Sequence, residues 1–338
     1  GMQSDSGLTK GVKVESPHAT VTFTAPKPCH VLSPNCDELG ELRVAPIGTP
    51  SRLLEASKLH LSEPSEFRSL LAPRARESNK GTYGHVLVLG GAAGKHGAAL
   101  MTGLAALRSG AGLVTVASSA EQLGVPELMT ARLPSGIGEL GRLVDRKDVL
   151  AVGPGLGSSP EHVQLVRDLV SDIDLPMTID ADGLNALVGC SWNGGSRIRV
   201  LTPHPGEMAR LLGVTIPDVQ ADRVYHASRF ATSHGCILVL KGYRTVIALP
   251  DGRCWINPTG TPALATGGTG DILAGMIAAF LHTPDSPPHL GVLAAVFLHG
   301  LAAQIGERTW GERGLIATDI LTYLPEALRE CTRVSDRI

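Results

Sequence analysis

The amino-acid sequence predicts an α/β protein with a mostly parallel central sheet flanked by helices on both faces. After residue 80, short apolar runs such as "HVLVLGG" and "CILVLKG" alternate with longer stretches of helical spacing such as "GAALMTGLAALRSGAG". The short runs are rich in Val and Leu without alternation, as in strands that are buried on both faces. This succession of strands and helices indicates βαβ units and therefore a parallel sheet.

Composition excludes several classes of function. The chain has 338 residues, enough for one large or two smaller domains, and it is 43% hydrophobic. Its net charge is −2 with scattered Lys and Arg, which does not favour a nucleic-acid or membrane-surface partner. Aromatic residues make up only 4%, which argues against a surface that stacks bases. No apolar run is expected to span a membrane, no secretory signal is evident, and the six cysteines form no CxxC pair, so we expect a cytoplasmic protein with reduced thiols.

The first 79 residues differ from the rest of the chain in composition and in the pattern of apolar residues. "ATVTFTA" (Ala19–Ala25) alternates as a strand does, and "GELRVAPIG" (Gly40–Gly48) is a second candidate strand. About 50 residues with few apolar side chains cannot bury a core alone. We therefore expect residues 19–48 to pack as an extended appendage on the main domain or on a neighbouring subunit. Residues 51–79 are mixed and charged, and we interpret them as a linker with one or two short helical pieces.

Polar and glycine-rich clusters follow the predicted strands. In open α/β sheets, ligands bind at the carboxyl ends of the strands. Each cluster alone would be an ordinary loop, but together they favour a site at this edge of the sheet. The clusters are Gly90–Gly97, Gly153–Gly157, Asp180–Asn185, Thr202–Glu207 and Lys241–Thr245.

Four familiar motifs do not fit these clusters. "GGAAGKH" lacks the spacing of a phosphate loop, and His96 stands where that loop needs Ser or Thr. "GPGLG" is not the GxGxxG of a dinucleotide site. His204 and Glu207 lie three residues apart, but no further ligand supports a metal-hydrolase site. Ser118 and Ser119 have no nucleophile-elbow context.

The stretch "ATGGTGDILAGMIAAF" (Ala265–Phe280) predicts an anion site with a base beside it. Its apolar residues have helical spacing, and small residues precede the helix. A helix N-terminus presents unpaired N–H groups and a partial positive charge, so Gly268, Thr269 and Gly270 form a candidate anion hole. Asp271 would then accept the proton of an attacking hydroxyl group. The alternative is that Asp271 only caps the helix.

The sequence also resembles a known family. The last stretch resembles the GxGD motif of the ribokinase-like superfamily, and seven stretches in order resemble the ADP-dependent NAD(P)H-hydrate dehydratase family. They cover the chain from about Phe67 to the C-terminus. They read "KGTYGHVLVLGG", "GAAL…LRSGAGLVTVAS", "VGPGLG", "IDADGLNAL", "LTPHPGEMARLLG", "LKGYRT" and "NPTGTPALATGGTGDILAGMIAAF".

This resemblance implies a reaction. Members of the family repair hydrated NADH and NADPH, (6S)-NADHX and (6S)-NADPHX. ADP, or ATP, phosphorylates the hydroxyl at C6, and loss of phosphate restores the ring; with ADP the other product is AMP. Two alternatives remain: a ribokinase-like kinase of a small hydroxymethyl or sugar substrate, and a nucleotide-binding regulatory module without turnover. The resemblance also implies Mg²⁺ as a cofactor and a homo-oligomer, by family likeness a tetramer.

The family's site residues are carried over position by position. Asp271 matches the catalytic base and Gly270 the last anion-hole position. Ala98, Gly155 and His204 match substrate-contacting positions, although the small residues could serve helix packing and His204 could be structural. Glu207 and Asp180 are weak candidates for holding magnesium through water, and either could cap a helix instead. The implied nucleotide-binding residues are Lys241, Gly242, Tyr243, Arg244, Thr245, Gly270 and Asn257.

The N-terminal part has a resemblance of its own. "SDSGLTKGVKVESPHATVTFTAPKP…GELRVAPIG" resembles the tail of an NAD(P)H-hydrate epimerase domain, which is often fused ahead of the dehydratase. The implied organisation is an epimerase remnant over 1–50, a linker over 51–79 and a ribokinase-like dehydratase domain over 80–338. Because the family's catalytic acid would precede this tail, we expect no epimerase activity.

Overall fold

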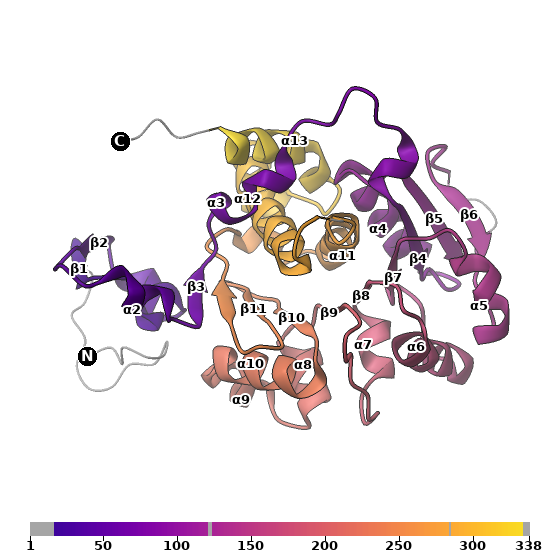
Figure 1. Ribbon diagram of the computed structural model, residues 1–338, viewed down its shortest axis with the longest axis horizontal. Helices are drawn as coiled ribbons and strands as arrows, with labels where there is room; N and C mark the ends of the chain where they lie inside the picture. The colour runs from indigo at the N-terminus through magenta and orange to yellow at the C-terminus, as the bar shows by residue number, and fades with distance from the viewer. Residues whose placement is uncertain (1–16, 121–123, 284, 334–338) are drawn as a thin grey trace.

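A computed structural model of the chain describes residues 17–120, 124–283 and 285–333, and its centre is a 10-stranded sheet (Figure 1). All neighbouring strands run parallel except β10–β11 and β11–β12, which are antiparallel. From one edge to the other, the strands are β3 (Leu59–Leu61), β12 (Cys254–Ile256), β11 (Val246–Ala248), β10 (Ile237–Leu240), β9 (Arg199–Leu201), β8 (Met177–Ile179), β7 (Val149–Val152), β4 (His85–Leu89), β5 (Leu113–Ser118) and β6 (Met129–Arg132).

The non-alternating apolar runs are explained by two cores, one on each face of the sheet. In β4, Val86 and Val88 belong to one hydrophobic cluster, whereas Leu87 and Leu89 belong to the other. Successive side chains of a strand point to opposite faces, so a strand covered on both sides needs an apolar residue at every position. The prediction of a mostly parallel sheet covered on both faces is confirmed.

Helices form a layer on each face of the sheet (Figure 1). One layer contains α4 (His96–Arg108), α11 (Thr269–Phe280), α12 (Pro288–Gly314) and α13 (Asp319–Thr332), with α3 (Pro64–Phe67) packed against α12. The other layer contains α5 (Ile137–Val144), α6 (Pro160–Asp172), α7 (Asp182–Ala186), α8 (Pro205–Leu212), α9 (Ile216–Ala221) and α10 (Arg223–His234). Short 3₁₀ turns are η2 (Arg68–Leu71), η3 (Lys80–Tyr83) and η4 (Pro262–Leu264).

The stretch expected to be a linker contains a strand of the sheet. Within 51–79, where one or two short helical pieces were expected, the structure has three, α2 (Ser51–Glu55), α3 and η2, and β3 pairs in parallel with β12 at the edge of the sheet. Strand β3 lies in a mixed, charged stretch without alternation, so no strand pattern marks it. β11 runs antiparallel to β10 and β12 runs antiparallel to β11, and neither of these short strands was predicted.

The two strands predicted near the N-terminus are present. β1 (Ala19–Phe23) and β2 (Glu41–Ala45) form a separate parallel pair, joined by α1 (Pro28–Val31) and η1 (Asn35–Glu38). The pair lies at one end of the molecule (Figure 1), with the side chains of Val21 and Phe23 60% and 57% exposed. A two-stranded ribbon is marginal on its own, so its position depends on α1 and η1.

Helix α12 corrects one sequence expectation. Among the described residues it is the one helix that is long and apolar enough to cross a membrane, with 27 residues. However, 78% of its apolar window is buried inside the protein, where it packs against α11 and α13. Its hydrophobicity is therefore that of a central core helix, since other helices already cover its apolar surface.

The contact between α4 and α11 depends on a glycine and gives a stability prediction. A Cβ atom at Gly275 would lie 2.0 Å from the backbone oxygen of Thr102 and 2.9 Å from the Cβ of Ala105. We expect Gly275→Ala to destabilise the protein by about 1–3 kcal/mol or more, because the two helices must separate. The measurement is the free energy of unfolding in urea.

Helix α5 offers a matched control for this substitution. A Cβ at Gly141 would meet no atom within 4 Å. Gly141→Ala should therefore be neutral or stabilising by about 0.5–1 kcal/mol, the helix preference of alanine over glycine. If Gly275→Ala and Gly141→Ala unfold at the same urea concentration, the close packing of α4 against α11 does not require glycine at position 275.

Candidate functional site

The structure brings the five strand-end clusters together. Hydrogen bonds and an ion pair link all five clusters across the carboxyl ends of the strands, with Lys241 joining both Asp180–Asn185 and Thr202–Glu207. The connecting contacts are Gly91 N to Pro154 O at 2.9 Å, Gly157 N to Asp182 Oδ2 at 2.8 Å, Lys241 N to Pro203 O at 2.8 Å and Lys241 Nζ to Asp180 Oδ1 at 2.7 Å. One continuous rim of loops therefore surrounds the start of helix α11.

One of the two glycines before α11 has a backbone conformation that favours glycine. Gly268 is the N-cap residue and has φ +96°, and a Cβ there would lie 2.6 Å from Cε of Met101. The Thr269 hydroxyl donates to the backbone oxygen of Leu264 at 2.9 Å, which fixes the entry into the helix. The first turn of a helix leaves backbone N–H groups without intrahelical partners, and here they open toward the loops. This is the anion-binding geometry that the sequence predicted.

Asp271 is the third residue of the helix and does not cap it. The cap position belongs to Gly268, and no side chain makes a capping hydrogen bond. Burial raises the pKa of Asp271 to about 6, repulsion from Asp180 and Asp182 adds to this, and attraction to Lys241 opposes it. The alternative interpretation of Asp271 as a helix cap is therefore wrong. At neutral pH this carboxylate is ionised but more basic than an ordinary aspartate.

Lys241 neutralises the acidic side chains around it. Its Nζ lies 2.7 Å from Asp180 Oδ1 and 3.9 Å from Glu207 Oε2, and its side chain is only 19% exposed. Burial lowers the pKa of Lys241, but its ion pairs outweigh burial and the net shift is upward. A Cβ on Gly270 would lie 3.3 Å from this ammonium group. Lys241 is therefore a mostly buried, paired lysine beside the anion-binding turn and not an ordinary exposed lysine at a strand end.

A cavity of about 410 Å³ opens beside this turn. The helix start contributes Thr269 and Gly270, and the antiparallel strands contribute the loops on either side. Arg244 does not line the cavity; its guanidinium donates to the backbone oxygen of Pro258 at 2.9 Å. Of the residues expected to bind nucleotide, those that line it are Lys241, Gly242, Tyr243, Thr245, Asn257 and Gly270.

Two residues organise the walls of the cavity from within. Asn257, which is 2% exposed, donates from its amide to Thr259 O at 2.9 Å and so fixes the turn after β12. His299 on α12 places Nε2 3.0 Å from the backbone oxygen of Thr269. Because a carbonyl only accepts, Nε2 carries the proton. Burial lowers the pKa of His299 to about 4, so the ring is neutral at physiological pH.

His299 is a site residue that sequence reasoning missed. It stands in the apolar run "AAVFLHGLAAQ", which reads as core. The available signal was a lone polar residue inside an otherwise apolar helix, and such residues need a hydrogen-bond partner.

The expected substrate-contacting residues do not line this cavity. His204 is the N-cap of α8: its Nδ1 accepts from Gly206 N at 3.0 Å, and its side chain is 52% exposed. A Cβ at Gly155 would lie 3.1 Å from the Cβ of Ala98. His204 therefore has the structural role of capping α8, and the small residues Gly155 and Ala98 allow close packing, as the alternative interpretations state. The exposed half of the His204 ring is still accessible to a ligand.

The described residues contain no group of three or more His, Cys, Asp or Glu side chains placed to hold a metal ion. Asp180 and Glu207, the weak candidates, both face the Lys241 ammonium. Burial raises the pKa of Glu207, and its Oε2 also accepts from the backbone N–H of His204 at 2.8 Å. A magnesium ion here would depend on phosphate and water ligands as well as protein ones.

Comparison with known proteins identifies what this arrangement is similar to. A family model described as NAD(P)H-hydrate dehydratase matches residues 86–326. The chain is 42% identical over 349 residues to a bifunctional NAD(P)H-hydrate repair enzyme of Moorella thermoacetica, with 97% of the chain and 65% of that relative covered. The chain thus spans 65% of the length of this relative.

Solved structures agree with the fold. The ADP/ATP-dependent NAD(P)H-hydrate dehydratase of Bacillus subtilis, co-crystallised with ATP and Mg²⁺, superposes with a TM-score of 0.72 at 34% identity and covers 82% of this chain and 100% of that one. A ribokinase-like superfamily protein of Enterococcus faecalis gives a TM-score of 0.72 at 27% identity, covering 82% of this chain and 98% of that one. The predicted ribokinase-like fold is confirmed.

The raised pKa of Asp271 predicts how stability changes with pH. Between about pH 4 and 6 the folded state binds more protons than the unfolded state, so this group makes stability fall as pH rises through that window. Asn cannot ionise. Asp271→Asn should therefore melt at a higher temperature than the parent at pH 7.5, and the difference should shrink at pH 4.5.

Asp172, exposed at the end of α6, is the control. Asp172→Asn should change the melting temperature little at either pH. If the melting temperatures of the parent and Asp271→Asn differ by the same amount at both pH values, ionisation of the Asp271 carboxylate does not destabilise the folded state.

Proposed function

The chain belongs to the NAD(P)H-hydrate dehydratase family, and from that premise we propose that it dehydrates (6S)-NADHX and (6S)-NADPHX to NADH and NADPH. The proposed phosphoryl donor is ADP, which is converted to AMP and phosphate. The single observation that carries the proposal is a carboxylate of raised pKa, Asp271, in the first turn of α11 beside a cavity of nucleotide size. That combination supplies a base and an anion hole at one point.

In the first step Asp271 accepts the proton of the substrate's C6 hydroxyl group. The freed oxygen forms a bond to the β-phosphorus of ADP, the bond from that phosphorus to the bridging oxygen breaks, and AMP leaves with the electron pair. The N–H groups around Gly268, Thr269 and Gly270 stabilise the charge on the transferring phosphoryl group, and the Lys241 ammonium adds to this. His299 holds the Thr269 carbonyl, which keeps the turn in this orientation.

In the second step the phosphorylated hydroxyl group leaves. The C6–O bond breaks, a proton is lost from C5, and the C5–C6 double bond of the dihydronicotinamide ring returns. The oxygen that entered as water departs within the phosphate. Phosphorylation thus converts hydroxide, a poor leaving group, into phosphate, a good one.

The cavity beside α11 fits the nucleotide. Lys241, Gly242, Tyr243, Thr245 and Asn257 would surround it, and Arg244 would act through its bond to the Pro258 carbonyl. The B. subtilis structure was obtained with ATP and Mg²⁺, which supports ATP as an alternative donor. Mg²⁺ would neutralise phosphate charge when bound, with Asp180 and Glu207 holding its water ligands.

The hydrated nicotinamide would lie on the opposite side of Asp271. Ala98 and Gly155 are small and lie close together, since a Cβ added at Gly155 would lie 3.1 Å from the Cβ of Ala98, and this would let a flat ring approach while the exposed half of His204 contacts it. We also propose that the protein works in the cytoplasm as a homo-oligomer, by family likeness a tetramer, on small molecules rather than on nucleic acids or membranes.

The test of the reaction is recovery of NADH absorbance from its hydrate, first with ADP and then with ATP. We expect recovery with at least one donor. The rival proposal, a ribokinase-like kinase, predicts instead that the protein makes ADP from ATP with a hydroxymethyl or sugar alcohol and leaves hydrated NADH unchanged. Binding of ADP or AMP with no turnover of any hydrate would favour a regulatory module.

Asp271→Asn tests the proposed base. The rate of NADH recovery should fall by about 10²–10⁴-fold, the usual contribution of a positioned general base. Affinity for AMP should hold or improve, because a negative charge near the phosphates is removed. The matched control is Asp172→Asn, which should keep the parent rate. If Asp271→Asn turns over within a few-fold of the parent, another group is the base.

The pH dependence of the rate tests the same assignment independently. The base works only when ionised, so the parent rate should fall as pH drops below about 6, the value to which the pKa of Asp271 is raised. The residual rate of Asp271→Asn should not show this fall at low pH. If the rates of both proteins fall with the same midpoint, the group that titrates is not Asp271.

A further inference from the structure

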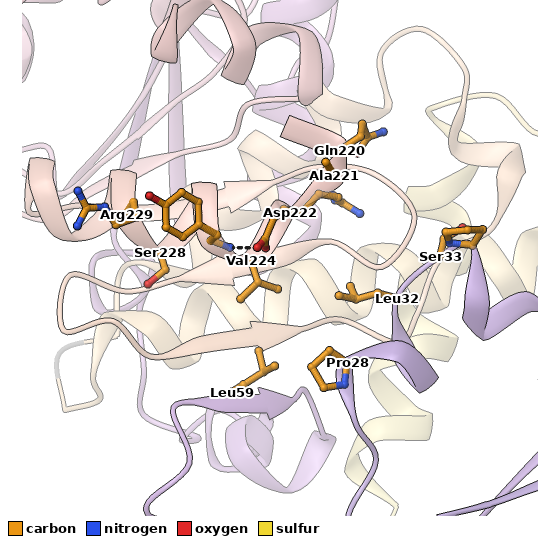
Figure 2. A pocket seen from close by; sticks show the side chains of 13 residues that line it. Pro28, Leu32, Ser33, Leu59, Gln220, Ala221, Asp222, Val224, Ser228 and Arg229 are labelled. Atoms are coloured by element: carbon orange, nitrogen blue, oxygen red, sulfur yellow. Dashed lines mark hydrogen bonds between the residues drawn. The ribbon is translucent and has the colours of Figure 1, made fainter. Parts of the chain in front are cut away.

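One arginine side chain lies between a surface crevice and the loop that lines the candidate nucleotide cavity. The crevice has a volume of about 380 Å³ and lies where the start of helix α10 meets the N-terminal appendage (Figure 2). Pro28 and Leu32 of the appendage line it, together with Asp222 and Val224 at the start of α10. Arg223, the first residue of α10, lines the same crevice. Its side chain is therefore partly accessible from the surface of the protein.

The Arg223 guanidinium binds three backbone carbonyl groups at and after the end of strand β10. Its Nη2 donates to the backbone oxygens of Leu240 at 2.9 Å and Lys241 at 3.2 Å, and its Nη1 donates to that of Tyr243. A Cβ added at Gly242 would lie 3.0 Å from Nη2, so the chain passes close to the guanidinium at a residue without a side chain. These contacts tie the loop after β10 to helix α10.

The loop 241–245 has a backbone that needs such support. Gly242 has φ +141°, and Arg244 has φ +58°, which a residue with a side chain rarely adopts. Such a conformation persists only where the surroundings hold it. The residues of this loop that line the cavity beside α11 are Lys241, Gly242, Tyr243 and Thr245. The conformation that Arg223 supports is therefore the one that shapes a wall of the candidate nucleotide site.

Arg223 holds this loop without an acidic partner. Burial lowers the pKa of its guanidinium to about 10, and no acidic side chain in the described part of the chain offsets that shift. Its Nε is buried and has no hydrogen-bond partner among the described residues. Removing a cation from water without an acidic partner costs stability, and groups of this kind are concentrated at functional sites. The three carbonyl groups are the partners that compensate for this burial.

We propose that Arg223 is a positioning residue, which sets nucleotide affinity by holding the loop 241–245 in the shape that lines the cavity. The planar guanidinium offers N–H donors in a fixed fork, and a single ammonium group cannot reproduce that geometry. This inference rests on the proposed function for the identity of the ligand, ADP.

Chemical rescue tests the proposal on the full chain. In Arg223→Ala, the Kd for ADP in calorimetry should rise by about 3–10-fold, the order of one lost hydrogen bond. Because Arg223 lines the crevice, its removal leaves a space open to solvent, and millimolar guanidinium chloride should restore part of the affinity. Tetramethylammonium chloride, which has no N–H donor, should not. Equal effects of the two salts, or no rescue by guanidinium, would contradict the proposal.

Two further variants separate the fork of donors from charge and from place on the helix. Arg223→Lys keeps the positive charge but not the fork, so its Kd for ADP should also rise; it carries the test if Arg223→Ala does not fold. Arg229→Ala is the matched control, because Arg229 is exposed on the same helix and lines the same crevice. It should bind ADP like the parent. Parent-like affinity in Arg223→Lys, or equal weakening in Arg229→Ala, overturns the proposal.

Kinetic constants distinguish positioning from a loss of folded protein. In Arg223→Ala, the KM for ADP should rise in parallel with the Kd, while the KM for the hydrate stays at the parent value. A smaller amount of folded protein would instead lower the apparent kcat and leave both KM values unchanged, and that result would count against a positioning role.

Hydrogen exchange of the nucleotide-free protein separates this inference from the proposed function. Arg223→Ala should speed exchange in residues 241–245 and leave α11 unchanged, whether or not ADP binds. A parent that binds no ADP but shows this effect contradicts the proposed function and supports the role of Arg223 in holding the loop. Equal exchange in parent and variant overturns that role even if the parent binds ADP.

Discussion

The ion pair between Lys241 and Asp180 is the contact on which the candidate site depends. It joins the loops after β10 and β8, and Glu207 after β9 lies at its edge, so three adjacent strand ends meet at one ammonium group. Asp180 is 2% exposed, and a buried carboxylate without its partner would be strongly destabilising. The pair therefore keeps these strand ends in place and sets a positive charge beside the N-terminal turn of α11.

The charge on Asp271 follows from this arrangement. Two nearby aspartates and burial favour its protonated form, and one lysine favours its ionised form. The net result is a carboxylate that is ionised at neutral pH and still basic enough to take a proton, which is the compromise that a general base needs. A neutral His299 holds the adjacent carbonyl without adding a positive charge that would reduce that basicity.

Close packing of helix α4 against helix α11 positions Asp271. Thr102 of α4 donates its hydroxyl to the backbone oxygen of Asp271 at 3.1 Å, and the absence of a side chain at Gly275 lets α4 and α11 touch. The loop 241–245 is held from α10, where the guanidinium of Arg223 donates to the backbone oxygens of Leu240, Lys241 and Tyr243. The strand pair β1–β2 of the N-terminal appendage lies apart from the sheet (Figure 1).

The sequence by itself determined the α/β class, the sheet covered on both faces, the convergence of five loops and the place of Asp271 at a helix start. Those features depend on local patterns: apolar runs, helical spacing and the glycines before α11. Only the tertiary structure decided that Lys241 is buried and paired, that Asp271 is not a cap, that Arg244 turns to Pro258 and that His299 supports the anion-binding turn. Strand β3 also escaped the sequence, because its pairing with β12 depends on residues about 190 or more positions apart meeting in space. A pattern within a short window records which side chains a segment offers, whereas burial and pairing, which set charge and pKa, depend on what the rest of the chain places around them.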